Sequence, residues 1–229
     1  MKNTFVQVLL ATLLILVLGL AVSWYTADTP SAANDLPWTI EPTADGSIKI
    51  FHMHLGVSTL SDFITRYQEP PEISLFVPQH GDARIEAYFN SVWMAGLKAK
   101  IVLSLMVSKQ DLDAMYDRGV RISTLEQGTR KVQLKGEDEL QLNRAPIVSI
   151  TYMPATTITD ELLQHRFGEP SKKMKELVNG AEHWLYPEKG LDVVLSDKDK
   201  AVFQYIAPAN FDRLMQPLTD KNNPSPTHP

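Results

Sequence analysis

Apolar side chains along this chain recur at two spacings, which distinguish strands from helices. Between residues 97 and 107 apolar and polar residues alternate, as in a half-buried β-strand. Residues 59–67 instead carry apolar side chains at positions 60, 63, 64 and 67, which share one face of an α-helix. Residues 109–118 have a comparable helical spacing, and residues 191–206 predict a β-hairpin. The chain is therefore predicted to be α+β, with short helices packed on one face of an antiparallel sheet.

Two stretches of the chain are similar to each other. Thr59-Leu-Ser-Asp62 matches Thr157-Ile-Thr-Asp160, and Arg66-Tyr-Gln-Glu-Pro70 matches Arg166-Phe-Gly-Glu-Pro170. In both copies the hydroxyl and the acid three residues later are typical of a helix start, and a proline follows the helix. The order and spacing of these matches predict two related α+β modules.

The segment between the two copies, residues 120–144, predicts two or three solvent-facing strands, interrupted at Gln127-Gly128 and Lys135-Gly136. After Leu218 the chain is polar and rich in proline, which is typical of a disordered terminus. The predicted parts of the soluble region are a first module at 47–146 with an insertion at 108–146, a second module at 147–218, and a disordered tail at 219–229.

The first 25 residues predict a transmembrane helix. No charge interrupts residues 5–22, and the run continued through Trp24 and Tyr25 is long enough to cross the ~30 Å hydrocarbon core of a bilayer. Lys2 precedes this run, and the charged residues that follow it are all acidic until Lys49. The rest of the chain is therefore expected outside the cytoplasm. A cleaved signal peptide is the alternative.

Residues 26–46 are small, polar and proline-bearing, and they predict a flexible tether between the membrane and the folded region. The expected location is the bacterial inner membrane, crossed once, with the soluble domain in the periplasm.

Composition narrows the possible functions. The chain has no cysteine, which excludes disulfides, thiolate metal sites, a cysteine nucleophile and lipid attachment at a signal end. Its net charge of −5 does not favour nucleic acid as a partner.

Few residues suggest chemistry. His52 and His54 would share one face of a strand and could together ligate a metal, although ordinary sheet positions explain them better. Serine-nucleophile and phosphate-loop motifs are absent from the sequence, and the paired carboxylates near residues 111 and 137 are better explained as solvated charge. We therefore expect no enzyme activity, no metal and no cofactor.

The most distinctive segment is His183-Trp-Leu-Tyr-Pro187. An exposed pair of large aromatic rings would mark a binding surface, which makes His183, Trp184 and Tyr186 the candidate binding residues. Trp184 and Tyr186 also share one strand face, so the alternative is that they fill the core.

Several of these residues together resemble a known superfamily, the tandem-repeat group that contains the SmpA/OmlA outer-membrane-assembly lipoproteins and the β-lactamase inhibitor proteins. The resemblance is carried by Thr157-Ile-Thr-Asp160, Phe167-Gly-Glu-Pro170, His183-Trp-Leu-Tyr186 and Gly190-Leu-Asp-Val193, and it covers residues 150–207. It implies a non-catalytic module that binds other envelope proteins through the outer face of its sheet. This chain differs by lacking the lipid-attachment cysteine and by its insertion at 108–146. It also resembles uncharacterised proteobacterial envelope proteins.

The resulting expectation is a membrane-anchored periplasmic protein-binding module for envelope assembly, with the inner membrane and another envelope protein as partners. One alternative is a periplasmic metal-dependent hydrolase that uses His52, His54 and a carboxylate. The other is a carrier of a small ligand or lipid.

Overall fold

The computed structural model describes residues 35–125, 128–177, 179–196 and 199–222. The predicted transmembrane helix, the first nine residues of the predicted tether (26–34) and the last residues of the predicted tail lie outside this range. No helix within it has the length and apolar character needed to cross a membrane.

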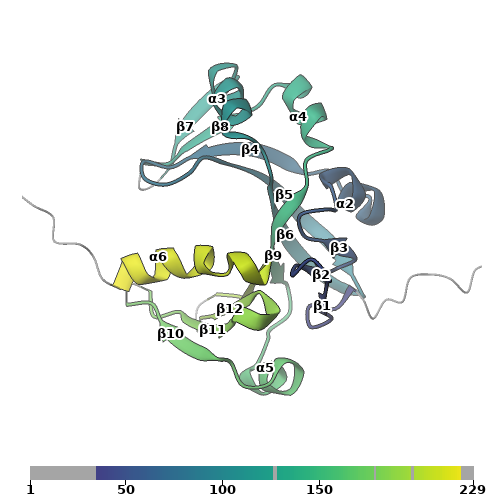
Figure 1. The fold of residues 1–229 in the computed structure, drawn as a ribbon, viewed down its shortest axis with the longest axis vertical. Helices are drawn as coiled ribbons and strands as arrows, with labels where there is room; N and C mark the ends of the chain where they lie inside the picture. The colour runs from purple at the N-terminus through teal and green to yellow at the C-terminus, as the bar shows by residue number, and fades with distance from the viewer. Residues whose placement is uncertain (1–34, 126–127, 178, 197–198, 223–229) are drawn as a thin grey trace, which may run out of the picture.

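The described chain is α+β and is built on one large antiparallel sheet (Figure 1). This sheet has ten strands in the order β10-β11-β12-β13-β9-β6-β5-β4-β8-β7. In chain order they are β4 (Glu72–Val77), β5 (Arg84–Met94), β6 (Leu97–Leu105), β7 (Arg121–Thr124), β8 (Arg130–Gln133), β9 (Ile147–Pro154), β10 (Lys172–Lys175), β11 (Glu182–Tyr186), β12 (Leu191–Leu195) and β13 (Val202–Ile206). A smaller sheet contains β1 (Glu41–Pro42), β2 (Ile48–Ile50) and β3 (Met53–His54).

Five α-helices accompany the sheets in the described range, together with two short 3-10 helices. The α-helices are α2 (Leu60–Tyr67), α3 (Lys109–Asp117), α4 (Gly136–Leu142), α5 (Asp160–Phe167) and α6 (Asp212–Asn222), and the 3-10 helices are η3 (Pro187–Lys189) and η4 (Pro208–Asn210). Figure 1 shows the large sheet bent into an arc, with α6 inside the arc and the other α-helices and the small sheet outside it.

The outer, convex face of the large sheet forms the core. Cross-strand pairing places buried apolar side chains in a continuous row across seven strands, consisting of Ile73, Ala87, Leu103, Ile150, Tyr205, Leu191 and Tyr186. The row passes through the pairing of β6 with β9, which joins the first half of the chain to the second. The two halves therefore share one hydrophobic core.

The elements with the clearest sequence patterns were predicted correctly. The strand expected from residue 97 is β6, where buried and exposed residues alternate. Helix α2 begins after Thr59, whose side chain accepts from the backbone of Asp62 while the Asp62 carboxylate accepts from the Thr59 N–H. Helix α3 also lies where its spacing predicted it.

The start of the second helix was predicted two residues early. Thr159 and not Thr157 caps α5, and its hydroxyl accepts from the N–H of Leu162. The hydroxyl of Thr157 instead accepts from Lys200. Alternate threonines at 157 and 159 both satisfy the capping pattern, so spacing alone does not select between them.

Part of the insertion was assigned to the wrong kind of element. Two of the expected strands are present as β7 and β8, but residues 136–142 form helix α4. Three consecutive acids lie in its first turn, where they interact favourably with the helix dipole. Asp138 and Leu142, four residues apart, are its buried residues, and Arg118 donates to Asp138 at 2.6 Å.

The described part of the predicted tether, residues 35–46, is packed against the domain, so the expectation of flexibility is wrong there. The Pro37 carbonyl accepts from the Tyr205 hydroxyl at 2.7 Å, and Arg166 lies 4.4 Å from the Trp38 ring centroid. Asp35 accepts from the Tyr67 hydroxyl at 2.6 Å. The predicted disordered tail likewise begins too early, because α6 continues to Asn222.

Candidate functional site

The three candidate binding residues all lie in β11 and are all buried. Trp184 and Tyr186 are fully buried on the convex side, where Trp184 lies opposite Val193 and Tyr186 opposite Leu191. The Tyr186 hydroxyl donates to the Gly168 carbonyl at 3.0 Å. The two rings therefore form part of the core and present no exposed surface to a partner.

His183 lies on the opposite, concave side of β11, between two buried carboxylates. Its Nδ1 is 2.8 Å from Asp192 and its Nε2 is 3.3 Å from Glu176. Both ring nitrogens thus face acceptors, which favours the doubly protonated imidazolium. Burial lowers the pKa of His183, but the hydrogen bond and charge of Asp192, reinforced by Glu176, outweigh burial and raise this pKa. Burial also raises the pKa of Asp192.

His52 and His54 do not share a strand face. The chain reverses at Phe51 and His52, which both have positive φ, and β2 and β3 pair across this turn. His52 lies near Asp35, with 3.6 Å between Nε2 and Oδ1, whereas His54 pairs with Asp45 at 3.0 Å. Within the described ranges no group of three or more potential ligands is arranged to hold a metal.

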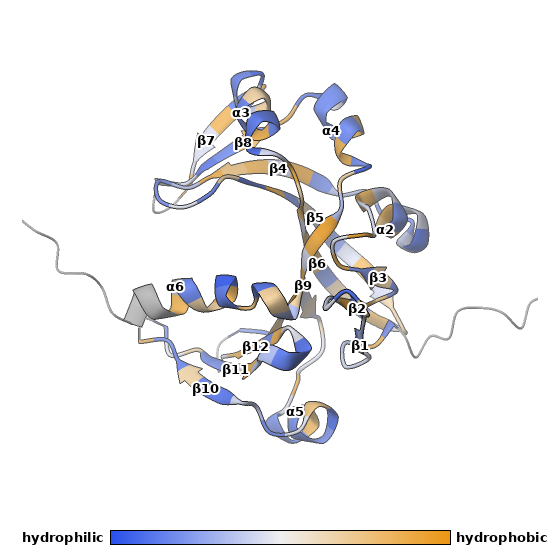
Figure 2. Cartoon of the chain, viewed as in Figure 1, coloured by the Kyte–Doolittle hydropathy of each residue, from blue (hydrophilic) through white to orange (hydrophobic). Residues whose placement is uncertain are grey.

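The concave face of the large sheet has two contrasting halves. Helix α6 covers the half formed by β10–β13 (Figure 1). It packs there through a small apolar cluster, separate from the main core, whose buried members are Leu185, Ile206, Phe211 and Leu218. Figure 2 shows α6 as alternating polar and apolar bands, as expected of a helix with one buried face.

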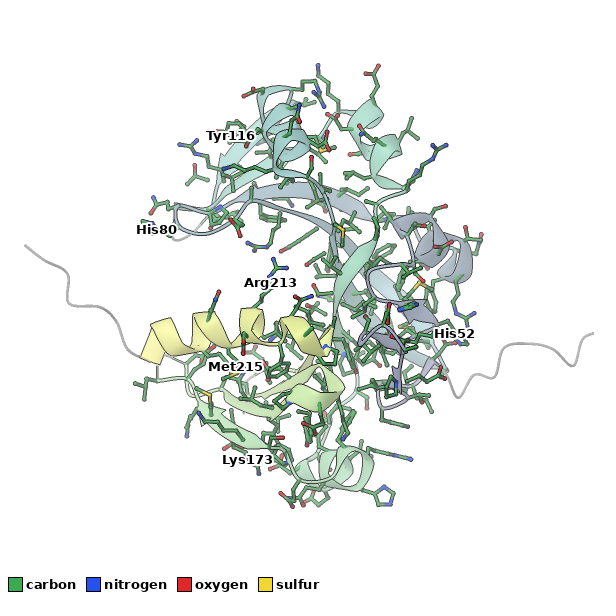
Figure 3. The ribbon with its side chains drawn as sticks, viewed as in Figure 1. His52, His80, Tyr116, Lys173, Arg213 and Met215 are labelled. Atoms are coloured by element: carbon green, nitrogen blue, oxygen red, sulfur yellow. The ribbon has the colours of Figure 1, made fainter. Side chains whose placement is uncertain are left out.

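The other half of the concave face, formed by β4, β5, β6 and β8, is not covered by a described helix. We refer to it as the open concave surface, and it consists of Glu72, Ser74, Phe76, Arg84, Glu86, Tyr88, Val102 and Lys131. Most of these residues line a hollow of about 250 Å³. Figure 3 shows Arg213 projecting from α6 toward this half of the arc.

Charges on the open concave surface are paired with one another. Lys131 donates to Glu72 at 2.6 Å, and Arg84 donates to Glu86 at 2.5 Å. Both cations also lie beside the half-buried Phe76 ring, with Arg84 5.7 Å and Lys131 6.0 Å from its centroid. These contacts orient the side chains before any partner binds.

Such a surface is suited to protein recognition. Tyr88 has a half-buried ring and a hydroxyl that donates to Asn90 at 2.9 Å, so it offers both apolar area and a polar group. Tyrosine, phenylalanine and arginine are enriched at protein interfaces, and preorganised side chains lose little entropy on binding.

Motifs in the sequence did not point to these residues, although one signal was present. Phe76 and Tyr88 alternate with core residues along β4 and β5, so they lie on the side of each strand where charged residues also occur. An aromatic residue among charged ones on the polar side of a strand is a pattern that could have been found. The pairing of strands that assembles the surface is not visible in the sequence.

Searches with this chain found no matching family model, no similar curated protein and no similar solved structure.

Proposed function

We propose that this chain is a periplasmic protein-binding module for envelope assembly, anchored in the bacterial inner membrane by its first 25 residues. Its open concave surface binds another envelope protein. The proposal rests above all on that surface, because half of a strongly curved sheet face has no described helix over it and carries Phe76, Tyr88 and Arg84.

The location in the proposal is supported by the sequence. The uncharged run at residues 5–22 has the length of a membrane span, and the acidic residues after it favour export of the rest of the chain. If residues 1–25 are a retained anchor, the full chain stays in the inner-membrane fraction after alkaline extraction. Release of the chain into the soluble fraction would contradict this part of the proposal.

The proposal also includes two related modules, residues 47–146 and 147–218. Support comes from the order of elements, since α2 is followed by the meander β4-β5-β6, and α5 is followed by the meander β10-β11-β12-β13. Each meander starts away from β9 and ends beside it.

Site-specific photo-crosslinking in intact cells tests the binding surface. A photoreactive amino acid at position 88 is expected to crosslink the full chain to a distinct second protein. The matched control is the same amino acid at Trp93, an exposed aromatic residue at the far end of β5. Equal labelling at both positions, or no product at position 88, would contradict the proposal.

A second experiment asks whether the surface determines binding. With the photoreactive group placed at Val102, which lines the same hollow, the double change Phe76→Ala and Tyr88→Ala is expected to remove most of the crosslinked product. The control change Trp93→Ala should leave it intact. Persistence of the product in the double variant would show that this surface does not determine binding.

A further inference from the structure

The two edges of the large sheet differ in how they are protected from other strands. The edge strand β10 has the sequence Lys-Lys-Met-Lys, and lysines along an edge oppose the approach of a second strand. The opposite edge strand β7, Arg121–Thr124, contains no lysine, and all four of its residues are exposed. Only β8 pairs with β7 in the described range.

Apolar residues are concentrated at the β7 edge. Ile122 is 48% exposed, and Val120 and Leu125, which flank the strand, are also large exposed apolar residues. The charged edge strand β10 has no exposed residue of this kind among its four. An exposed strand edge with apolar side chains is a template for adding another strand.

The backbone of β7 is oriented for such pairing. The N–H of Leu125 donates to the Thr129 carbonyl at 2.7 Å, so Leu125 and Thr129 form a hydrogen-bonded pair. In the same register Ser123 lies opposite Lys131 and Arg121 opposite Gln133. Because hydrogen-bonded and non-hydrogen-bonded positions alternate in an antiparallel pair, the backbone groups of Arg121 and Ser123 face β8. Those of Ile122 and Thr124 face outward.

We infer that β7 pairs edge to edge with β7 of a second copy of this chain, antiparallel and centred on Ile122. In this register Ile122 lies opposite Ile122 of the other copy, and the two residues exchange their outward N–H and C=O groups. Arg121 of each copy then lies opposite Ser123 of the other, so no cation faces a cation.

Neighbouring registers are less favourable. Centring the pair on Arg121 places two arginines directly opposite each other, which is destabilising. Centring it on Ser123 places Arg121 opposite the apolar Leu125. The edge is therefore self-complementary in the Ile122-centred register, where apolar side chains meet across the two-fold axis and no two cations are opposed, and this favours a second copy as the partner. This edge is distinct from the open concave surface.

Cysteine crosslinking tests both the dimer and its register, because the chain has no cysteine of its own. In full-length protein under mild oxidation, Ile122→Cys is expected to form a disulfide-linked dimer, since directly opposed residues have Cα atoms about 5.5 Å apart. Ser123→Cys is the register control, because Ser123 faces Arg121 of the other copy. Val57→Cys, another exposed apolar position, is the control for random collision.

Efficient crosslinking through position 122 alone supports the proposed register. Equal crosslinking at positions 122 and 57 would overturn the dimer, and stronger crosslinking at 123 than at 122 would overturn the register. Absence of a dimer in all three variants would also overturn the inference.

A measurement without crosslinking uses sedimentation of the full chain in detergent over a range of concentrations. Ile122→Lys is expected to weaken dimerisation by about tenfold or more, because it removes the apolar contact and opposes two like charges. Val57→Lys should leave dimerisation unchanged, and circular dichroism confirms that both variants fold. A wild-type chain that stays monomeric, or a dimer unaffected by Ile122→Lys, would overturn the inference.

Discussion

The two halves of the concave face are each built from four antiparallel strands and differ in what covers them. On the β10–β13 half, Leu185 and Ile206 lie beneath α6, and the imidazole of His183 is enclosed with its two carboxylates. On the β4–β6 half, Glu86 and Tyr88 lie in the open concave surface and pair with nearby side chains. The side chains of each half thus match its surroundings: apolar residues lie beneath α6, and charged and aromatic residues lie where no described helix covers the sheet.

The comparison also indicates where stability and binding reside. Side chains beneath α6 are desolvated, so their loss should reduce the free energy of unfolding. Side chains of the open surface are partly solvated, and their loss should reduce binding with little effect on stability. The following changes test that separation.

The largest effect is expected at the enclosed imidazole. His183→Leu removes the cation between Asp192 and Glu176 and leaves two buried carboxylates facing each other, which should lower the free energy of unfolding by about 4 kcal/mol. Urea unfolding followed by circular dichroism measures this. The control is His54→Leu, which breaks the exposed pair with Asp45 and should cost under about 1 kcal/mol. Equal losses of unfolding free energy in the two variants would show that burial of the histidine–carboxylate contacts does not determine their contribution to stability.

The next effect concerns the helix cover itself. Phe211→Ala removes a buried ring from the small cluster beneath α6 and should cost about 3 kcal/mol in the same measurement. Phe76→Ala removes a half-buried ring of the open surface and should cost about 1 kcal/mol. A larger loss for Phe76→Ala than for Phe211→Ala would reverse the proposed roles of the two halves.

A smaller effect is expected from pH. Because the pKa of His183 is raised in the folded chain, its stabilising contribution is complete below its ordinary pKa, about 6.5, and is lost as the pH rises through the raised value. The difference in stability between wild type and His183→Leu should therefore shrink as the pH rises above about 6.5. Burial and Arg66 lower the pKa of His52, which acts in the opposite direction, but His52 is present in both proteins and its contribution cancels. A difference that grows with pH would contradict this assignment.

The smallest effect is expected at the charged pairs of the open surface. Lys131→Gln removes the ion pair with the exposed Glu72 and should change the free energy of unfolding by under about 1 kcal/mol. Crosslinking from position 88 should fall in the same variant, because Lys131 lines the same hollow. A large loss of stability without a change in crosslinking would assign Lys131 to folding rather than to binding.

Local patterns predicted the elements that depend on neighbouring residues. Alternation identified β6, and the capping pair Thr59 and Asp62 identified the start of α2. The prediction of a shared strand for His52 and His54 was wrong, because the chain turns at Phe51 and His52 without a glycine or asparagine to indicate it.

Features that depend on distant residues could not be predicted in this way. The packing of residues 35–46 depends on Tyr205 and Arg166, which are far along the chain. The open concave surface requires the register of β4 with both β5 and β8, and no local spacing encodes it. For the same reason, the two possible environments of Trp184 could be distinguished only once the partner strand β12 was known.

The hydrogen bond from Tyr205 to the Pro37 carbonyl has a mechanical consequence. It joins residues 168 positions apart and attaches the segment before the small sheet to the last strand of the large one. A pulling force applied to the chain before residue 35 therefore reaches β13, beside the centre of the large sheet, and not only the two-residue strand β1. Tension on this segment should therefore be resisted by the large sheet, because the point where force enters is tied to a strand near the centre of that sheet.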